Sequence, residues 1–216
     1  MSRAFRPLRR FGEDARGTTL VELAFVIPLF LLFLFGLIDF GRLAYHWVAA
    51  EKATAIAARI ATVRLPACGG VPDSYVRGDN TTIAFGTNCS FTNGVCTVPG
   101  TVTCTGNASN TTAAEIWGRI APLLPNDAEI SNLRFTYSPD GDSSDGVVEQ
   151  IGFLGGPYVP TVTVELEDLV FRFATPLSGL ANLASGATGS TISSDIAIPT
   201  MSVSMPGEDL NFGTEG

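Results

Sequence analysis

The chain has a single histidine, His46, among 216 residues, and its four cysteines form no Cys-x-x-Cys pair. A histidine-based catalytic triad and a zinc or thioredoxin-type site would therefore lack their groups. No glycine-rich phosphate loop follows a predicted strand. Carboxylates such as Glu149, Glu165 and Glu167 could serve a hydrolase, but nothing in their spacing singles them out. The sequence predicts a protein that is not an enzyme and that has no cofactor and no metal site.

Basic side chains are scarce after the first 17 residues. Residues 1–17 contain five arginines against Glu13 and Asp14, whereas the remaining chain has 8 basic and 19 acidic side chains. Nucleic-acid binding requires a basic face for the phosphates, so we expect no nucleic-acid partner. The chain combines a cationic leader with an acidic body.

A long apolar run follows the leader. Residues 23–38 contain no charge, and with Leu20 and Val21 the run is long enough to cross a hydrocarbon core of about 30 Å. The arginines precede it, so the positive-inside bias places the N-terminus in the cytoplasm and the body outside. We predict a cytoplasmic leader at 1–17 and a transmembrane helix at 18–39.

The helical pattern continues beyond the membrane, because neither glycine nor proline occurs between Gly41 and Pro66. We predict one helix from about Thr18 to Arg64, with residues 40–65 as its extramembrane continuation and Pro28 as a site of kinking. An apolar stripe is expected to pack under the protein's own sheet; it comprises Tyr45, Ala49, Ala53, Ile56, Ile60 and Val63. Asp39 and Arg42 have i,i+3 spacing and are candidates for a subunit contact or for a solvated ion pair.

An ordinary signal peptide is an alternative interpretation of the N-terminal region. Val48-Ala49-Ala50 before Glu51 resembles a small-residue cleavage site. The apolar run is longer than a usual signal region, and Asp39, Arg42 and His46 would lie between it and the cut. These features favour a retained membrane helix.

Residues 66–216 are predicted to form an exported β-rich domain, which makes the fold class α+β. Its cysteine-bearing part, 66–110, contains Cys68, Cys89, Cys96 and Cys104, which indicate two disulfides in an oxidising compartment, although buried thiols are the alternative. The sequence leaves all three pairings open. Strands are predicted at 81–85, 94–98, 101–105, 134–138, 147–153, 158–167 and 191–204.

One short helix is predicted from Thr111 to about Ala121, with Thr112 and Glu115 at capping-box spacing. The acidic loop at 140–146 misses the EF-hand spacing, so a hairpin turn is preferred to a calcium site. Residues 169–183 are interpreted as a connector packed on the core, with a membrane-touching loop as the alternative.

Glu22 is the most informative residue of the apolar run, because a carboxylate inside a membrane helix is unfavourable and marks a functional candidate. Gly17 lies five positions before it, at the end of the leader. A cut after Gly17 would give Thr18 a new α-amine about one helical turn from Glu22. That amine could neutralise the carboxylate within the same chain or in a neighbouring subunit.

Three stretches resemble a known family: Arg16-Gly17-Thr-Thr-Leu-Val-Glu22-Leu-Ala-Phe-Val-Ile-Pro28-Leu, Gly36-Leu-Ile-Asp39-Phe40-Gly41-Arg42 and Ala57-Ala58-Arg59. They are similar to the TadE-like family, the minor pilin-like subunits of the tight-adherence (Flp-type) pilus. The resemblance is specific over residues 16–64. Leu23 stands where the family typically has Phe or Tyr, and TadF-like and TadG-like relatives share the same N-terminal pattern.

The resemblance implies processing by a prepilin peptidase after Gly17, with Thr18 as the new first residue and Glu22 as the acid at position five. It also implies a bacterial inner-membrane protein with a periplasmic domain, whose partners are other pilin-like subunits and the pilus assembly machinery. The competing hypothesis is a single-pass anchored binding module that displays a disulfide-stapled β domain. The sequence does not decide between a place in the fibre, at its tip or in the assembly platform.

Overall fold

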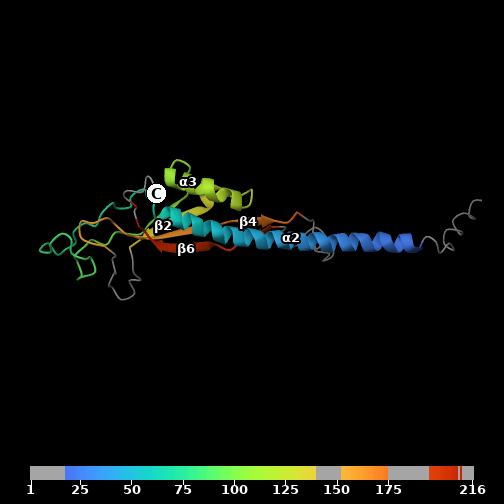
Figure 1. Cartoon of the computed structure of the whole chain (residues 1–216), viewed down its shortest axis with the longest axis horizontal. Helices are drawn as coiled ribbons and strands as arrows, with labels where there is room; N and C mark the ends of the chain where they lie inside the picture. The colour runs from blue at the N-terminus through green and yellow to red at the C-terminus, as the bar shows by residue number, and fades with distance from the viewer. Residues whose placement is uncertain (1–17, 140–151, 175–194, 209, 211–216) are drawn as a thin grey trace, which may run out of the picture. The chain divides into compact units, whose positions relative to one another are not determined.

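The computed structural model describes residues 18–139, 152–174, 195–208 and 210 (Figure 1). The chain divides into two compact units, one with residues 1–43 and 173–194 and the other with residues 44–172 and 195–216. The boundary between the units falls inside one helix, α2 (Thr18–Ala61).

Helix α2 confirms the predicted long helix, although it ends at Ala61 and not near Arg64. The last turn tightens, because the Val63 N–H bonds to the Ile60 carbonyl at 3.2 Å. The carbonyl of Thr62 then accepts a hydrogen bond of 2.9 Å from the Glu208 N–H. Pro28 lies inside the helix, as predicted.

The N-terminal part of α2 presents apolar side chains outward. From Leu20 to Phe35 every residue is exposed. Among the described residues, α2 is the one helix whose length and composition suffice to cross a membrane, over Leu20–Ala61. Such a helix is a candidate anchor, in agreement with the predicted single-pass protein.

In the second unit, the face of α2 that is buried consists of small side chains. Ala50, Ala53, Ala57, Ala58 and Ala61 have no exposed surface. The predicted stripe was partly wrong: Ala49 and Ala53 are buried, but Tyr45 and Ile56 are exposed. Alanine lets the helix backbone approach its neighbours closely, so the small face packs inward and the larger side chains remain outside.

Four antiparallel strands form the main sheet, in the order β1-β2-β3-β6. They are β1 (Val102–Thr105), β2 (Leu133–Ser138), β3 (Thr161–Leu166) and β6 (Met201–Pro206). A second, two-stranded sheet pairs β4 (Val170–Arg172) with β5 (Asp195–Ala197). Together with α2 this architecture confirms the α+β class.

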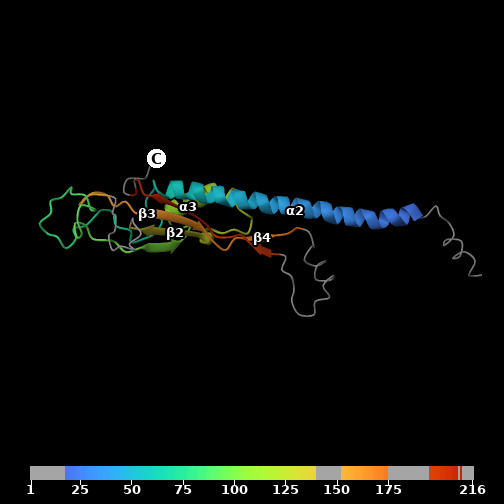
Figure 2. The same ribbon diagram turned by 90° about the horizontal axis from the view of Figure 1, so that it is seen from below.

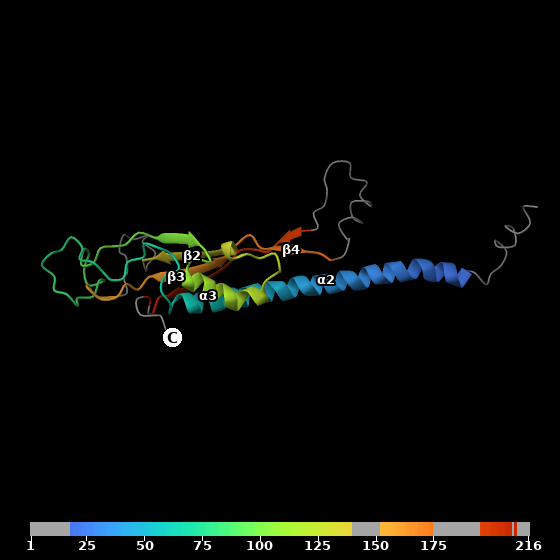
Figure 3. The same ribbon diagram turned by 90° about the horizontal axis from the view of Figure 1, so that it is seen from above.

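Strand β3 lies within the predicted strand 158–167, and its alternating sequence gives it a buried face that comprises Val162, Val164 and Leu166. In β2, Phe135 and Tyr137 are buried on the same side, since they pair with Val164 and Val162. The cyan C-terminal end of α2 lies alongside the sheet and α3 in Figures 2 and 3. The core of this unit therefore lies where the alanine face of α2 meets the apolar face of the sheet.

Several predicted strands are absent or divided. Residues 81–85 form no strand, and in 94–98 only Cys96 forms a bridge, with Arg77. The stretch 191–204 contributes two strands to two different sheets, because Pro199 in the break between β5 and β6 has no N–H to donate. Within 169–183, residues 170–172 are a strand and not a loop, while 175–183 lie outside the described residues. Of the predicted strand 147–153, the described part contains a bridge at Phe153 to Asn88.

The short helix α3 (Thr111–Ile120) confirms its prediction, with Ile116 and Ile120 fully buried. Its predicted capping box was wrong. The N-cap is Asn110, whose side chain accepts the Ala113 N–H at 2.9 Å, because Thr112 and Glu115 are engaged by other parts of the chain. Two 3-10 turns, η2 (Ala121–Leu123) and η3 (Ile130–Asn132), connect α3 to β2.

Candidate functional site

The predicted processing segment lies at the start of α2. The helix begins at Thr18, and Glu22 is an exposed residue in its early turns. Gly17 lies outside the described residues. Apolar side chains surround Glu22 on the helix, and Leu20 and Leu23 are both exposed. A carboxylate in this exposed position is accessible to a charge from another molecule.

Asp39 and Arg42 form the predicted ion pair, with 3.0 Å between Arg42 Nη1 and Asp39 Oδ1. The same Oδ1 accepts the backbone N–H of Ala174 at 3.3 Å. Asp39 is only 1% exposed, and the ring of Phe40 meets the ring of Phe173 edge-on at 5.8 Å. These contacts fasten the backbone at 173–174 to α2, a role that the i,i+3 spacing alone did not reveal. Whether the pair also contacts another subunit stays a prediction.

The connector after α2 is tied to α3 by an ion pair. Arg64 Nε donates to Glu115 Oε2 at 3.0 Å, and this hydrogen bond holds the pKa of Glu115 below its ordinary value. The Thr112 hydroxyl donates to the Leu65 carbonyl at 2.8 Å. Sequence reasoning missed this junction, because the partners are 51 and 47 positions apart.

The sheet also holds the connector, through a buried phenol. The Ala67 N–H donates to the hydroxyl oxygen of Tyr137 at 2.9 Å. Burial raises the pKa of Tyr137 to about 12, since the phenolate would lose its hydration. The hydroxyl of this tyrosine thus accepts a hydrogen bond from a buried backbone N–H of the connector.

All four cysteines form disulfides, so the prediction of two bridges is confirmed. The pairs are Cys68–Cys104 and Cys89–Cys96. The first joins the connector after α2 to edge strand β1. The second closes a short loop, and together they choose one of the three pairings that the sequence left open.

The second bridge belongs to a separate small core, which we call the disulfide lobe (residues 71–98 and 152–158). Its buried residues are Tyr75, Cys89, Val95, Cys96, Leu154 and Tyr158. Backbone hydrogen bonds join its two segments, including Tyr75 to Gly156 and Leu154 to Thr87, both at 2.9 Å. In Figure 3 these segments are the loops drawn in teal, green and orange at the left of the picture. Sequence reasoning missed this core, because the segments are distant and lack a strand period.

The disulfide lobe exposes aromatic side chains. Phe85 is 71% exposed, Phe91 76% and Phe153 55%. The Arg77 guanidinium lies 4.6 Å from the centre of the Phe85 ring, as in a cation–π contact. The lobe thus combines a disulfide-held backbone with an apolar surface.

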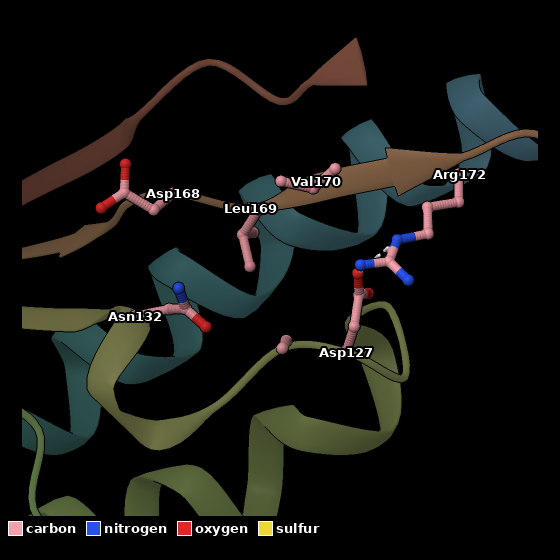
Figure 4. Close-up of a pocket in the computed structure, with 7 residues that line it drawn as sticks. Asp127, Asn132, Asp168, Leu169, Val170 and Arg172 are labelled. Atoms are coloured by element: carbon pink, nitrogen blue, oxygen red, sulfur yellow. Dashed lines mark ion pairs between the residues drawn. The ribbon is translucent and has the colours of Figure 1, made fainter. Parts of the chain in front are cut away.

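A polar hollow of about 200 Å³ lies between β4 and the segment that precedes β2 (Figure 4). Arg172 pairs with Asp127 across it, with 3.7 Å between Nε and Oδ2. Asn132 borders the hollow and donates from its side chain to the Glu167 carbonyl at 3.0 Å. Among the described residues, no group of three or more acidic, histidine or cysteine side chains is placed to hold a metal ion. The acidic loop 140–146 lies outside the described residues, so its turn and calcium interpretations are not tested.

Taken together, the described residues combine a candidate membrane anchor that carries an acid near its start with an α+β domain that holds two disulfides. Residues 17–59 match the family model described as TadE-like protein. The match begins at Gly17 and ends two residues before the end of α2, so the N-terminal segment of this chain is TadE-like. The resemblance is thereby confirmed over about a fifth of the chain, and it associates the protein with the tight-adherence pilus system. No curated protein and no solved structure matches the chain.

Proposed function

We propose that the protein is a minor pilin-like subunit that takes part in assembly of a tight-adherence pilus and is processed by a prepilin peptidase after Gly17. The observation that carries the proposal is the TadE-like match, which starts at Gly17 and spans the helix that begins at Thr18. The exposed apolar surface of α2 from Leu20 to Phe35 supports it, because such a surface needs lipid or neighbouring helices around it.

In this proposal the cut exchanges a basic leader for a single amine. The five arginines of residues 1–17 hold the N-terminus in the cytoplasm until cleavage removes them. The α-amine of Thr18 then pairs with Glu22 of a neighbouring subunit and sets the register between laterally packed helices. The inner membrane, the peptidase, other pilin-like subunits and the assembly machinery are the proposed partners, and the β domain lies in the periplasm or on the pilus.

N-terminal sequencing of the mature protein tests the processing step, and we expect the first residue to be Thr18. Gly17→Glu should block maturation while the protein still inserts into the membrane. Gly12→Glu, a matched change within the leader, should be processed normally. An intact leader in the mature protein, or a start at Glu51, would contradict the proposal.

The role of Glu22 is separable from cleavage. Glu22→Gln removes the charge that would meet the Thr18 amine, so we expect normal processing but at least tenfold less incorporation into pili, about 1.4 kcal/mol. Glu51→Gln is the control, since Glu51 is exposed on the same helix. Equal incorporation of both variants would show that Glu22 does not set the register.

A second candidate function is an anchored binding module, and the exposed Phe85, Phe91 and Phe153 of the disulfide lobe favour it. This function needs the membrane helix but not the cut after Gly17. A protein that keeps its leader and acts at the cell surface would support the module and exclude the pilin-like subunit.

A further inference from the structure

Both edges of the four-stranded sheet are open in the part of the chain that the structure describes. The strand order β1-β2-β3-β6 leaves β1 and β6 with one neighbour each. Strand β6 is six residues long and exposes every second residue, from Ser202 to Pro206. An open edge presents unpaired backbone N–H and C=O groups, which are a template for another strand.

The charged side chains of the sheet lie on its central strands and not on its edge strands. Edge strands are commonly guarded by charged side chains, which oppose pairing with another chain. Here the charges lie on the two central strands, where Arg134 Nη2 contacts Glu165 at 2.5 Å and Glu167, just after β3, at 2.7 Å. Neither β1 (VTCT) nor β6 (MSVSMP) has a charged residue. Neither edge strand is therefore guarded by charge, and the one proline of the two, Pro206, stands at the end of β6.

Strand direction determines which edges can meet. Each neighbour in the sheet is antiparallel, so β1 and β6 of one copy run in opposite directions. A second copy placed beside the first by translation brings its β1 next to β6 in antiparallel orientation. Translation also keeps α2 of every copy pointing the same way, as insertion into one membrane requires.

Self-pairing of β6 is the competing arrangement, because Met201-Ser202-Val203-Ser204-Met205 reads the same in both directions. An antiparallel β6–β6 pair requires a half-turn about an axis normal to the sheet. That rotation reverses residues 44–61 of α2, which lie alongside the sheet (Figures 2 and 3), whereas translation keeps their direction the same in both copies. The direction of the strands therefore favours the β6–β1 arrangement.

The side-chain patterns of the two edges fit in one register. A row of hydroxyls crosses the sheet through paired positions, with 3.3 Å between Thr103 and Thr136 and 2.8 Å between Thr163 and Ser204. Placing Ser204 opposite Thr103 of the next copy continues this row. The same register places Met205 opposite Val102, so half-buried side chains meet half-buried ones.

We propose that β6 of one copy pairs antiparallel with β1 of a second copy, which makes one continuous sheet across laterally adjacent subunits. The interface is head-to-tail and does not close on itself, so it extends a row of subunits. The inference uses the anchored helix but not the cut after Gly17, and its test is independent of processing.

Site-specific photo-crosslinking in the membranes of cells that make the full chain tests the interface. A benzophenone amino acid at position 202 lies opposite Thr105 of the next copy in the proposed register. We expect a covalent dimer whose linked peptide contains residues 102–105, in both the native chain and the Gly17→Glu variant. The absence of a dimer, a link to residues 201–206 of the second copy, or a link only to another protein would overturn the proposal.

Charge variants then test the register. Ser204→Lys and Thr103→Glu should each lower the crosslinked dimer about fivefold, and the double variant should restore it to within about twofold, because the charges then face each other. Thr163→Lys is the matched control, with the same charge one strand inward, and should leave the dimer within about twofold of native. Equal loss in the control, or no rescue in the double variant, would contradict this register.

Discussion

Single polar side chains hold together the region where the long helix meets its domain. Tyr137 accepts the Ala67 N–H and Glu115 accepts from Arg64, so two residues distant in the sequence fix the connector after α2. The sequence predicted a strand at 134–138, but not that the Tyr137 hydroxyl meets the connector. Hydrogen-bond partners 70 and 51 positions apart leave no local signal in the sequence.

We expect Tyr137→Phe to lower the free energy of unfolding by about 1–3 kcal/mol, because the buried Ala67 N–H would lose its partner. Burial raises the pKa of Tyr137 to about 12, so the folded state disfavours the phenolate. The contribution of Tyr137 to the stability of the native protein should therefore be constant below about pH 10 and fall as the pH rises toward 12. Urea unfolding of the full chain in detergent measures both effects. If Tyr137→Phe lost as much stability above about pH 10 as the native protein, Tyr137 would not be the group responsible for that loss.

Glu115→Gln tests the ion pair with Arg64. The pKa of Glu115 is lowered, so its contribution is present above the ordinary carboxyl range and is lost as the pH falls through the folded-state pKa. Because this carboxylate is one-third exposed, we expect a loss of less than about 1 kcal/mol at pH 7. The difference in the free energy of unfolding between Glu115→Gln and the native protein should vanish in strong acid. The control Glu51→Gln should change the free energy of unfolding little.

Among the helices and strands, those with regular apolar spacing along their length were predictable from the sequence. Strand β3 and helix α3 have alternating or helical apolar spacing that survives in the structure. The segments around Cys89 and Cys96 have no such period, and their backbone hydrogen bonds go to other loops: those around Cys89 to residues 152–154, and those around Cys96 to residues 76–80. Predicting strands there from composition failed for that physical reason. For the candidate site, the local spacing Gly17–Glu22 and Asp39–Arg42 could be read directly, whereas the Ala174 contact with Asp39 could not.

Helix α2 packs through alanine, so enlarging that face should be harmful. Ala57→Leu places three extra carbons where no surface is exposed, and we expect a loss of about 1–3 kcal/mol. Ile56→Leu, on the neighbouring exposed position, should stay within about 0.5 kcal/mol of native. Thermal unfolding followed by circular dichroism compares the two. Equal stability of both variants would refute the close approach of this face to the core.

At the scale of the whole molecule, the two disulfides should differ in their contribution to the free energy of unfolding. Cys68–Cys104 spans 36 positions and Cys89–Cys96 spans 7. By the chain-entropy relation the first restricts the unfolded chain more, by roughly 4 against roughly 2.5 kcal/mol. Replacing each pair with alanine and measuring urea unfolding should give the larger loss for Cys68 and Cys104. The reverse order would mean that native-state packing, and not loop closure, governs these bonds.

The disulfide lobe also determines the order in which parts of the chain can fold as it emerges. Its two segments, 71–98 and 152–158, are separated by β1, α3 and β2 in the chain. If the polypeptide emerges on the far side of the membrane from α2 onward, Cys89 and Cys96 can be oxidised as soon as both have appeared. Tyr75 and Val95 cannot be covered until Leu154 and Tyr158 have also crossed. In that case the nascent lobe keeps an open apolar surface while about sixty further residues cross, an interval in which chaperones and oxidases on that side can act.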